Sequence, residues 1–271
     1  MNYPRISAKI YREPWCVTAS SHADIRRAFE QHGAAFAHDI TSALELQPED
    51  EPQSVGPVAV IPIFGVIGKH LSMLETACGG VDLDGTADAL AVAVHDPEVT
   101  SILLHFNSPG GTVTGTPELA ARIKAAAKVK PVVAYTDNQM CSAAYWLGSQ
   151  CTAIFASQTA DVGSIGVYMA LLDESVALAQ AGVKVNVVKA GKHKTAGAPF
   201  QPLSDEDRAR FQAEVDFIYA KFTAAVSEQR PDVDEATMQG QSFNGEQAAR
   251  NGLTDGVVDS LDEMLEHMTS A

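Results

Sequence analysis

One serine of the chain stands in a setting that suits a nucleophile. In the stretch MCSAAYWLGS (residues 140–149), Ser142 lies between a cysteine and two alanines, where a buried segment is predicted to turn into a helix. Small neighbours let a backbone turn sharply and let another chain approach closely, and an attacking serine needs both. A helix start would accept the same residue, since serine is a favoured N-cap. This stretch alone therefore leaves two interpretations of Ser142, a nucleophile and a helix cap.

Candidate bases for this serine lie further along the chain, and serine is a poor nucleophile unless a base removes its proton. After Ser142 the remaining histidines are His193 and His267, and His267 falls in a predicted terminal helix. The stretch AGKHKTAGAPF places Lys192, His193 and Lys194 together among small and apolar residues. Such surroundings can lower the pKa of a lysine, because desolvation disfavours the ammonium form, and a neutral lysine can act as a base. The alternative is that these are ordinary solvated charges.

Three glycine-bearing turns follow predicted strands: residues 107–111 (NSPGG), the Ser142 stretch, and residues 163–166 (GSIG). Ligands of open α/β sheets bind beyond the carboxyl ends of the strands, so the three turns can meet at one place. The NSPGG turn lacks the lysine of a phosphate loop and the glycine spacing of a dinucleotide fingerprint. Its unhindered backbone N–H groups suit a developing oxyanion, and the alternative is a simple tight turn.

Strands and helices alternate along the part of the chain that must position these turns. Apolar, β-branched runs predict strands over 58–68, 100–111 and 130–136, with further short strands over 152–169 and 183–191. Helices are predicted over 81–99, with Asp84 or Thr86 near the start, and over 116–129, with Pro117 in the first turn. This order predicts an α/β fold of right-handed βαβ units with a mostly parallel sheet.

The clearest helix is predicted between Asp205 and Gln229. Ser204 and Asp207 match a capping box, which marks a helix start. One face of this helix carries an apolar stripe, which is expected to pack against the core or against a sister subunit. The stripe consists of Phe211, Val215, Ile218, Phe222 and Val226.

The two ends of the chain differ from its middle. Residues 22–46 are weakly helical, and residues 47–57 (QPEDEPQSVGP) are acidic and rich in proline, as in a linker. We therefore divide the chain into an N-terminal helical extension and linker over 1–55 and a main domain over 56–271. Within the main domain, residues 240–268 are expected to form turns and a short terminal helix.

Composition and charge disfavour several classes of partner. The 19 basic and 34 acidic residues give a formal charge of −15, which disfavours nucleic acid and anionic membranes. Four cysteines, Cys16, Cys78, Cys141 and Cys151, are scattered without metal-ligand spacing, so we expect reduced thiols and no metal. The N-terminus lacks the pattern of a signal peptide, and no apolar run reaches the roughly 20 residues that span a bilayer. We expect a protein of the cytoplasm.

Four ordered motifs resemble those of the signal-peptide-peptidase-A-type serine peptidases, which share the Clp-protease/crotonase fold. In chain order they are LLHFNSPGGTVTGTPELAARIK, KPVVAYTDNQMCSAAYW, TADVGSIGV and AGKHKTAGAPFQPLSDEDRARF, and the closing GEQAARNGLTDGVVD is similar too. The resemblance covers about Val58 to Asp259. The variants CSAAYW and GKHKTAGAPF are most similar to the phage head-maturation branch, the minor capsid protein C type. The resemblance implies a Clp-protease/crotonase-like fold of repeated ββα and βαβ units, with a serine peptidase domain over 56–271.

The resemblance also assigns the principal roles at the site. It makes Ser142 the nucleophile and Lys194 the general base, in a Gly-x-x-Lys pattern that begins at Gly191. The oxyanion hole would consist of the backbone N–H groups of Gly110 or Gly111 and of Ala143.

Neighbouring residues receive lesser roles from the same resemblance. Ser164 matches a family serine that orients the lysine. Cys141 is expected to point away from Ser142, and His193 is expected to face solvent or a neighbouring loop. The family often has two glycines after the nucleophile, whereas this chain has two alanines. Alanine keeps its N–H group, so the oxyanion role survives, but the turn has less conformational freedom.

The function that the resemblance implies is that of an ATP-independent serine endopeptidase with a Ser-Lys dyad and no cofactor. Its partners would be polypeptide substrates, namely scaffold, capsid or portal proteins cleaved during phage head maturation, in the host cytoplasm or inside the procapsid. Family members form closed rings, so we expect a homo-oligomer with the helix between Asp205 and Gln229 near a subunit boundary. Three alternatives stay open: a bacterial peptidase in protein turnover, a catalytically silent capsid or scaffold component, and an acyl-CoA enzyme of the crotonase type.

Overall fold

Three long parallel strands form the centre of the structure. The structure is a computed structural model and describes residues 10–11, 13–32, 51–72, 75–76 and 79–270. The central strands are β3 (Val58–Phe64), β6 (Ser101–Ser108) and β8 (Val132–Cys141). They are paired in parallel along most of their length and are largely buried, as their apolar runs predict. The predicted α/β fold with a mostly parallel sheet is confirmed.

Shorter strands extend this sheet on both sides. Next to β8 lie β9 (Ala153–Ala156) and β10 (Asp161–Gly163), both parallel to it, so the short strands predicted over 152–169 are confirmed. At the two edges, β2 (Gln53–Val55) and β11 (Ser242–Asn244) pair antiparallel with their neighbours. The prediction that 47–57 is a linker throughout is therefore wrong, because Gln53–Val55 finds a partner in β3.

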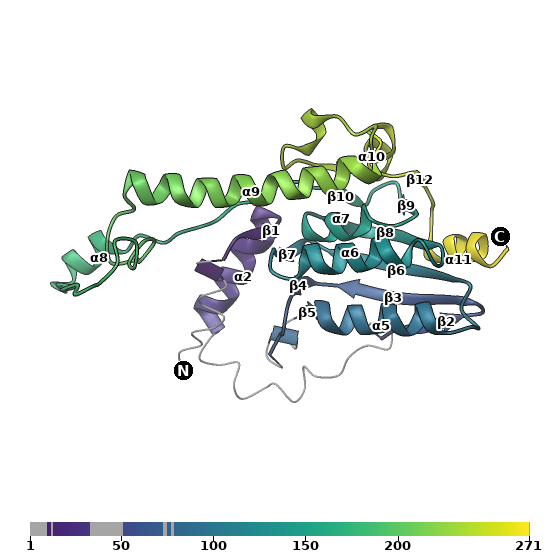
Figure 1. The fold of residues 1–271 in the computed structure, drawn as a ribbon, viewed down its shortest axis with the longest axis horizontal. Coiled ribbons are helices and arrows are strands. Elements are labelled where there is room, and N and C mark those ends of the chain that lie inside the picture. Colours follow the sequence, from purple (N-terminus) through teal and green to yellow (C-terminus); the bar gives the residue numbers. More distant parts are fainter. Residues whose placement is uncertain (1–9, 12, 33–50, 73–74, 77–78, 271) are drawn as a thin grey trace.

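Helices cover both faces of the sheet (Figure 1). On one face, α5 (Leu83–His95), α6 (Thr116–Ala126) and α7 (Ala143–Gly148) lie side by side over the main core. On the other face, α11 (Leu261–Ser270) covers a smaller apolar cluster through Met264. The N-cap of α5 is Asp82, whose side chain accepts the N–H of Asp84, so Asp84 lies near the helix start, as predicted.

A second, smaller sheet lies beyond the carboxyl end of β3. It contains β1 (Trp15–Val17), β7 (Gly110–Thr112), β4 (Val66–Gly68) and β5 (Gly80–Asp82), in that order. The single strand predicted over 58–68 is in fact two strands. The break falls at Gly65, whose φ of +97° is in the left-handed region and whose place is too close to the Gly79 carbonyl for any Cβ.

The longest helix is α9 (Asp205–Gln229), with the bounds that the sequence predicts. Ser204 caps it by accepting the N–H of Asp207 at 3.1 Å. Of the predicted apolar stripe, the last three members are buried: Ile218, Phe222 and Val226. Phe222 stacks on Trp146 of α7 with 4.6 Å between ring centroids, so α9 packs directly on the helix that follows Ser142.

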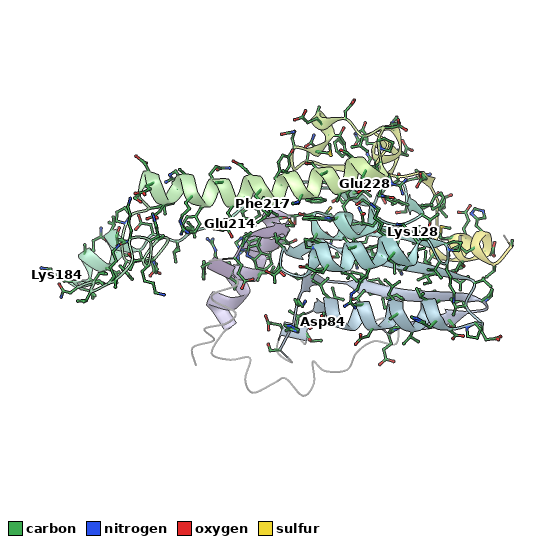
Figure 2. All side chains as sticks on the ribbon, in the orientation of Figure 1. Asp84, Lys128, Lys184, Glu214, Phe217 and Glu228 are labelled. Carbon is green, nitrogen blue, oxygen red and sulfur yellow. The ribbon has the colours of Figure 1, made fainter. Side chains whose placement is uncertain are left out.

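Residues 171–203, which we call the arm, precede α9. Figure 1 shows α8 (Ser175–Gln180) beyond the N-terminal end of α9, away from the sheets, and Figure 2 places Lys184 at the tip. The strand predicted over 183–191 is wrong, since the structure has no strand there. Its valines are exposed, and Val188 is 100% exposed. An apolar run forms a strand only where another strand is available to pair with it, and within the described chain none lies beside the arm.

The remaining segments lie at the two ends of the chain. At the N-terminus, α2 (Ala19–His32) confirms part of the helix predicted over 22–46, and the rest of that range lies outside the described residues. Near the C-terminus, a 3-10 turn at Glu235–Met238, α10 (Gly245–Arg250) and β12 (Gly256–Val257) precede α11. Among the described helices, none has the length and apolar character needed to cross a membrane.

Candidate active site

Ser142 occupies a strained turn between β8 and α7. Its φ of +56° and ψ of −116° fall in a region that residues other than glycine rarely adopt. The residue stands at the N-cap position of α7, yet its side chain makes no capping hydrogen bond. The side chain is buried, and its Oγ has no hydrogen-bond partner. The geometry therefore does not support a helix-cap role and leaves the hydroxyl available for chemistry.

The neighbouring strand β10 fixes the position of this turn. The N–H of Ser142 donates to the carbonyl of Gly163 at 2.7 Å. Ser164, the next residue, also has a positive φ of +53°, and its N–H donates to the carbonyl of Gln241 at 2.8 Å. Two serines in the left-handed region thus stand at adjacent strand ends, and the sequence-predicted pair Ser142 and Ser164 is brought together.

Gly110 approaches Ser142 from the NSPGG turn. A Cβ built on Gly110 would stand 2.9 Å from the Cβ of Ser142 and 3.0 Å from the backbone nitrogen of Ala143, and the residue has a φ of +101°. Only glycine fits that place and that conformation. The N–H of Ala143 opens α7 and so has no acceptor within the helix. Gly110, Ala143 and Ser142 therefore meet at one point, as the three-turn hypothesis requires.

Gly111 lies one residue further and faces a different neighbour. A Cβ on Gly111 would collide with the carbonyl of Ile67 in β4. On its other side Gly111 is paired with Cys16 of β1. The two predicted oxyanion glycines thus have separate requirements: Gly110 is close to the nucleophile, and Gly111 is close to the backbones of two flanking strands.

Within one chain, Lys194 lies far from the point where Ser142, Gly110 and Ala143 meet. Its segment is tied to the first turn of α9, where Lys192 forms an ion pair with Glu206 and His193 Nδ1 lies 2.8 Å from Asp207 Oδ1. This hydrogen bond holds the pKa of Asp207 below its usual value. Asp207 stands about 22 Å along the helix axis from Phe222, which packs above α7. The exposed Lys194 is therefore not brought to Ser142 within one chain.

The thiols near the site are structural. Cys141, next to the nucleophile, directs its Sγ to the carbonyl of Asp161 at 3.6 Å, and burial raises its pKa to about 12. Burial also raises the pKa of Cys16 and of Cys151, the latter to about 12. All three are free, whereas Cys78 lies outside the described residues. A neutral thiol is neither a nucleophile nor a metal ligand. In the described part of the chain no group of His, Cys, Asp and Glu could hold a metal ion.

One element beside the site, the short strand β1, is not predicted from the sequence. Trp15–Val17 pairs with β7 on the edge opposite to β4. Its signal was present but weak: an aromatic residue and a valine directly after Pro14. A run of three residues is too short for its alternation to be recognised, and its partner lies nearly one hundred residues away.

Comparisons with known proteins place the chain in a peptidase family. The model of Peptidase family S49 matches residues 124–271, which is more than half of the chain. The capsid assembly protease C of Escherichia phage lambda is 32% identical over 235 residues, covering 83% of this chain and 54% of that protein. The head-tail preconnector protein GP5 of Enterobacteria phage P21 is 32% identical over 236 residues, covering 86% of this chain and 47% of that protein.

The chain thus spans about half the length of these two phage proteins. Among solved structures, an enoyl-CoA hydratase/isomerase family member aligns with 81% of this chain and 74% of its own, with a TM-score of 0.42 and 16% identity, a similarity too low to carry an argument. The match to the family model includes the Ser142 turn, Ser164 and the Gly-x-x-Lys segment. On the extent of that match, the chain belongs to peptidase family S49.

Proposed function

We propose that the chain is an ATP-independent serine endopeptidase whose nucleophile is Ser142. The observation that carries the proposal is the strained turn of Ser142, which buries a hydroxyl with no partner beside Gly110 and the first N–H of α7. Backbone strain of this kind persists where the surrounding structure enforces it and is concentrated at active sites. Membership of the S49 family supports the same conclusion.

In the proposed reaction, Ser142 Oγ attacks the carbonyl carbon of a peptide bond. The proton of the hydroxyl passes to Lys194 Nζ, and the carbonyl oxygen accepts hydrogen bonds from the N–H groups of Ala143 and of Gly110 or Gly111. Lys194 then gives its proton to the departing amine, which leaves an acyl ester on Ser142. A water molecule, deprotonated by Lys194, releases the acyl group and restores the hydroxyl. Ser164 is proposed to orient the lysine from the adjacent strand end.

The position of Lys194, beside the first turn of α9, favours the participation of a second copy of the chain in this reaction. Lys194 belongs to the arm, which extends away from the sheets (Figure 1), and the arm exposes a run of valines that a neighbouring copy can cover. We therefore propose a closed homo-oligomer in which Lys194 of one copy serves Ser142 of the next. Heterologous contacts of this kind generate rings when the rotation between copies closes.

The biological substrates are proposed to be scaffold, capsid or portal proteins of a phage head. The support is that one similar protein is named a capsid assembly protease and another a head-tail preconnector protein. Incubation with the proteins encoded beside the gene tests this, with the Ser142→Ala chain as control. Cleavage that depends on Ser142 supports the proposal, whereas cleavage of unfolded host proteins alone favours a role in protein turnover.

Mixing two inactive variants tests the sharing of the dyad between copies. Ser142→Ala keeps the lysine and Lys194→Ala keeps the serine. If the dyad forms between copies, co-folded mixtures recover part of the activity that each variant lacks alone. Mixtures that stay inactive, while remaining assembled by light scattering, would show that each dyad forms within one chain.

A further inference from the structure

The strand β1 lies against β7, directly beside the proposed active site. The two strands are antiparallel and pair Trp15 with Thr112, Cys16 with Gly111 and Val17 with Gly110. The pairing continues beyond both ends of β1. The N–H of Val113 donates to the carbonyl of Pro14 at 3.4 Å, and the N–H of Thr18 donates to the carbonyl of Pro109 at 3.1 Å. Five consecutive residues of the N-terminal segment therefore follow the strand that contains both oxyanion glycines.

The other edge of β1 is also occupied. Trp15 and Tyr168 exchange two backbone hydrogen bonds, at 2.9 and 3.1 Å. His22 of α2 packs on both rings, with centroid distances of 5.2 Å to Trp15 and 5.4 Å to Tyr168. The segment thus lies in a slot between β7 and Tyr168, hydrogen-bonded from both sides, and Figure 1 shows β1 and α2 together beside β7.

This slot passes over the nucleophile. The carbonyl of Cys16 is so close to Gly110 that it would collide with a Cβ there, and the same Cβ would stand 2.9 Å from the Cβ of Ser142. Hydrogen-bonded pairs recur every second residue in an antiparallel ladder. Contacts at Pro14 and Thr18 therefore make Cys16 and Gly111 the hydrogen-bonded pair between them. The main chain of Cys16 occupies the N–H of Gly111, and Ser142 is 1% exposed.

The side chain of Cys16 shows what kind of residue the slot accepts. It is fully buried and belongs to the main core cluster. A small apolar side chain fits there, whereas a charged one would be buried without a partner. β7 does not need β1 to remain in a sheet, because it also pairs with β4 through Gly111 and Ile67. An extended peptide that adds a strand to a sheet edge gains main-chain hydrogen bonds in the same way.

We propose that the slot between β7 and Tyr168 is the site for an extended peptide substrate, and that β1 occupies it as an internal competitor. The peptidase is closed while β1 is seated and opens when β1 leaves. A substrate that displaces β1 carries a small apolar residue at the place of Cys16. This inference rests on the proposed peptidase function.

The first test measures how fast a fluorophosphonate probe labels the active-site serine in the full chain. Trp15→Ala removes the ring that packs on His22 and should label about tenfold faster or more, because a larger fraction of molecules has an open site. Trp15→Phe keeps an aromatic contact and should label near the unaltered rate. Met264→Ala, which removes a buried side chain of α11 in the cluster on the other face, controls for general destabilisation and should not accelerate labelling. Labelling of Trp15→Ala at or below the unaltered rate overturns the inference.

The second test needs no catalysis. A fluorescent peptide of residues 13–20 (EPWCVTAS) is titrated, under reducing conditions, into the Ser142→Ala chain that also carries Trp15→Ala. We expect saturable binding by anisotropy, weaker binding to Ser142→Ala with Trp15 intact, and loss of binding for a peptide with Cys16→Arg. Equal binding of the two peptides, or binding of neither, overturns the inference.

The two tests together separate failure of the inference from failure of the proposed function. If the peptide binds but the probe labels no variant, β1 occupies a peptide-binding slot and the proposed peptidase function is wrong. If all variants label equally and no peptide binds, the peptidase stands and the inference fails.

Discussion

Ser142 and Lys194 stand in regions built in opposite ways. Around Ser142, neighbouring strands and α7 bury the side chain, and hydrogen bonds to β10 hold the turn in a strained conformation. Around Lys194, the arm exposes its valines and has few contacts beyond the first turn of α9. The region around Ser142 is packed within the chain, whereas the region around Lys194 keeps apolar side chains exposed. In terms of the proposed dyad, the contrast teaches that folding of one chain positions Ser142, whereas the proposed association of copies would position Lys194.

The largest effect is expected in the packed region around Ser142. Ser142→Ala should lower the turnover of an unfolded protein substrate by about four orders of magnitude or more, because loss of a nucleophile leaves only binding and the oxyanion hole. The fold should survive, since the change removes one hydroxyl that has no partner. Turnover and the thermal midpoint are measured together. Retained turnover in this variant would falsify the assignment of Ser142.

Loss of the base should be the next largest effect. Lys194→Ala should lower turnover by about three orders of magnitude, within the range that a positioned proton acceptor contributes. His193→Ala should keep most of the turnover, because His193 is held by Asp207 at the start of α9 rather than at the serine. The same assay serves both variants. The opposite result, with His193→Ala inactive and Lys194→Ala active, would move the base to the neighbouring residue.

A pair of glycines separates steric precision at the site from general backbone effects. Gly110→Ala should lower the free energy of unfolding by about 2 kcal/mol or more and remove turnover, because of its positive φ and the crowded place of its Cβ. Gly85→Ala in α5 has open space for the Cβ and should raise stability by up to about 1 kcal/mol. Denaturant unfolding measures both. A harmless Gly110→Ala contradicts the close approach of the NSPGG turn to Ser142.

A smaller effect on folding, with a large effect on assembly, is expected in the arm. Val188→Asp should change the free energy of unfolding by less than about 0.5 kcal/mol, since the side chain is fully exposed. It should nevertheless shift the mass measured by light scattering towards the monomer and lower turnover with it. Val92→Asp, at another exposed valine on α5, is the matched control and should leave the mass unchanged. Assembly of Val188→Asp at the unaltered mass would exclude this part of the arm from the interface.

The smallest effect concerns pH and the N-terminal segment. Burial lowers the pKa of His22 from its ordinary value of 6.5, with a further lowering from Arg26 and an opposing contribution from the Ile10 carbonyl. The released segment therefore binds more protons than the seated one. Seating is strongest above pH 6.5 and weakens as the pH falls below it. Amide hydrogen exchange of residues 15–18 should accelerate between pH 6.5 and 5 beyond the intrinsic trend, and His22→Gln should abolish that excess.

The sequence predicts the central fold well because its signals are local. The strands β3, β6 and β8 each begin with an apolar run, although β8 continues to Cys141, five residues past the predicted end at 136. Ser204 and the apolar stripe give the bounds of α9. The setting of Ser142 among small residues is also a local signal. The lack of a hydrogen-bond partner for the Ser142 hydroxyl cannot be predicted locally, because it depends on groups from three separate turns.

Other features depend on distant partners and so escape local reasoning. β1 was missed because three residues carry no periodicity and their pairing with β7 is set by the folded sheet. The strand predicted over 183–191 is apolar enough but has no strand beside it in the described chain. The order of the motifs predicts a role for Lys194 at the active site. Its distance from Ser142 depends on the course of α9, which the motifs do not show.

The stack of Trp146 on Phe222 gives α9 the geometry of a lever. The two ring planes are nearly parallel, with an angle of 5° between them, and they join α9 to α7 one turn after Ser142. A tilt of about 5° at this pivot moves the first turn of α9, about 22 Å away, by about 2 Å. A misplacement of about 1 Å in a reacting group can lower a rate about a hundredfold. Small changes in the contact between copies of the proposed oligomer would therefore suffice to raise or lower the activity of all the proposed dyads together.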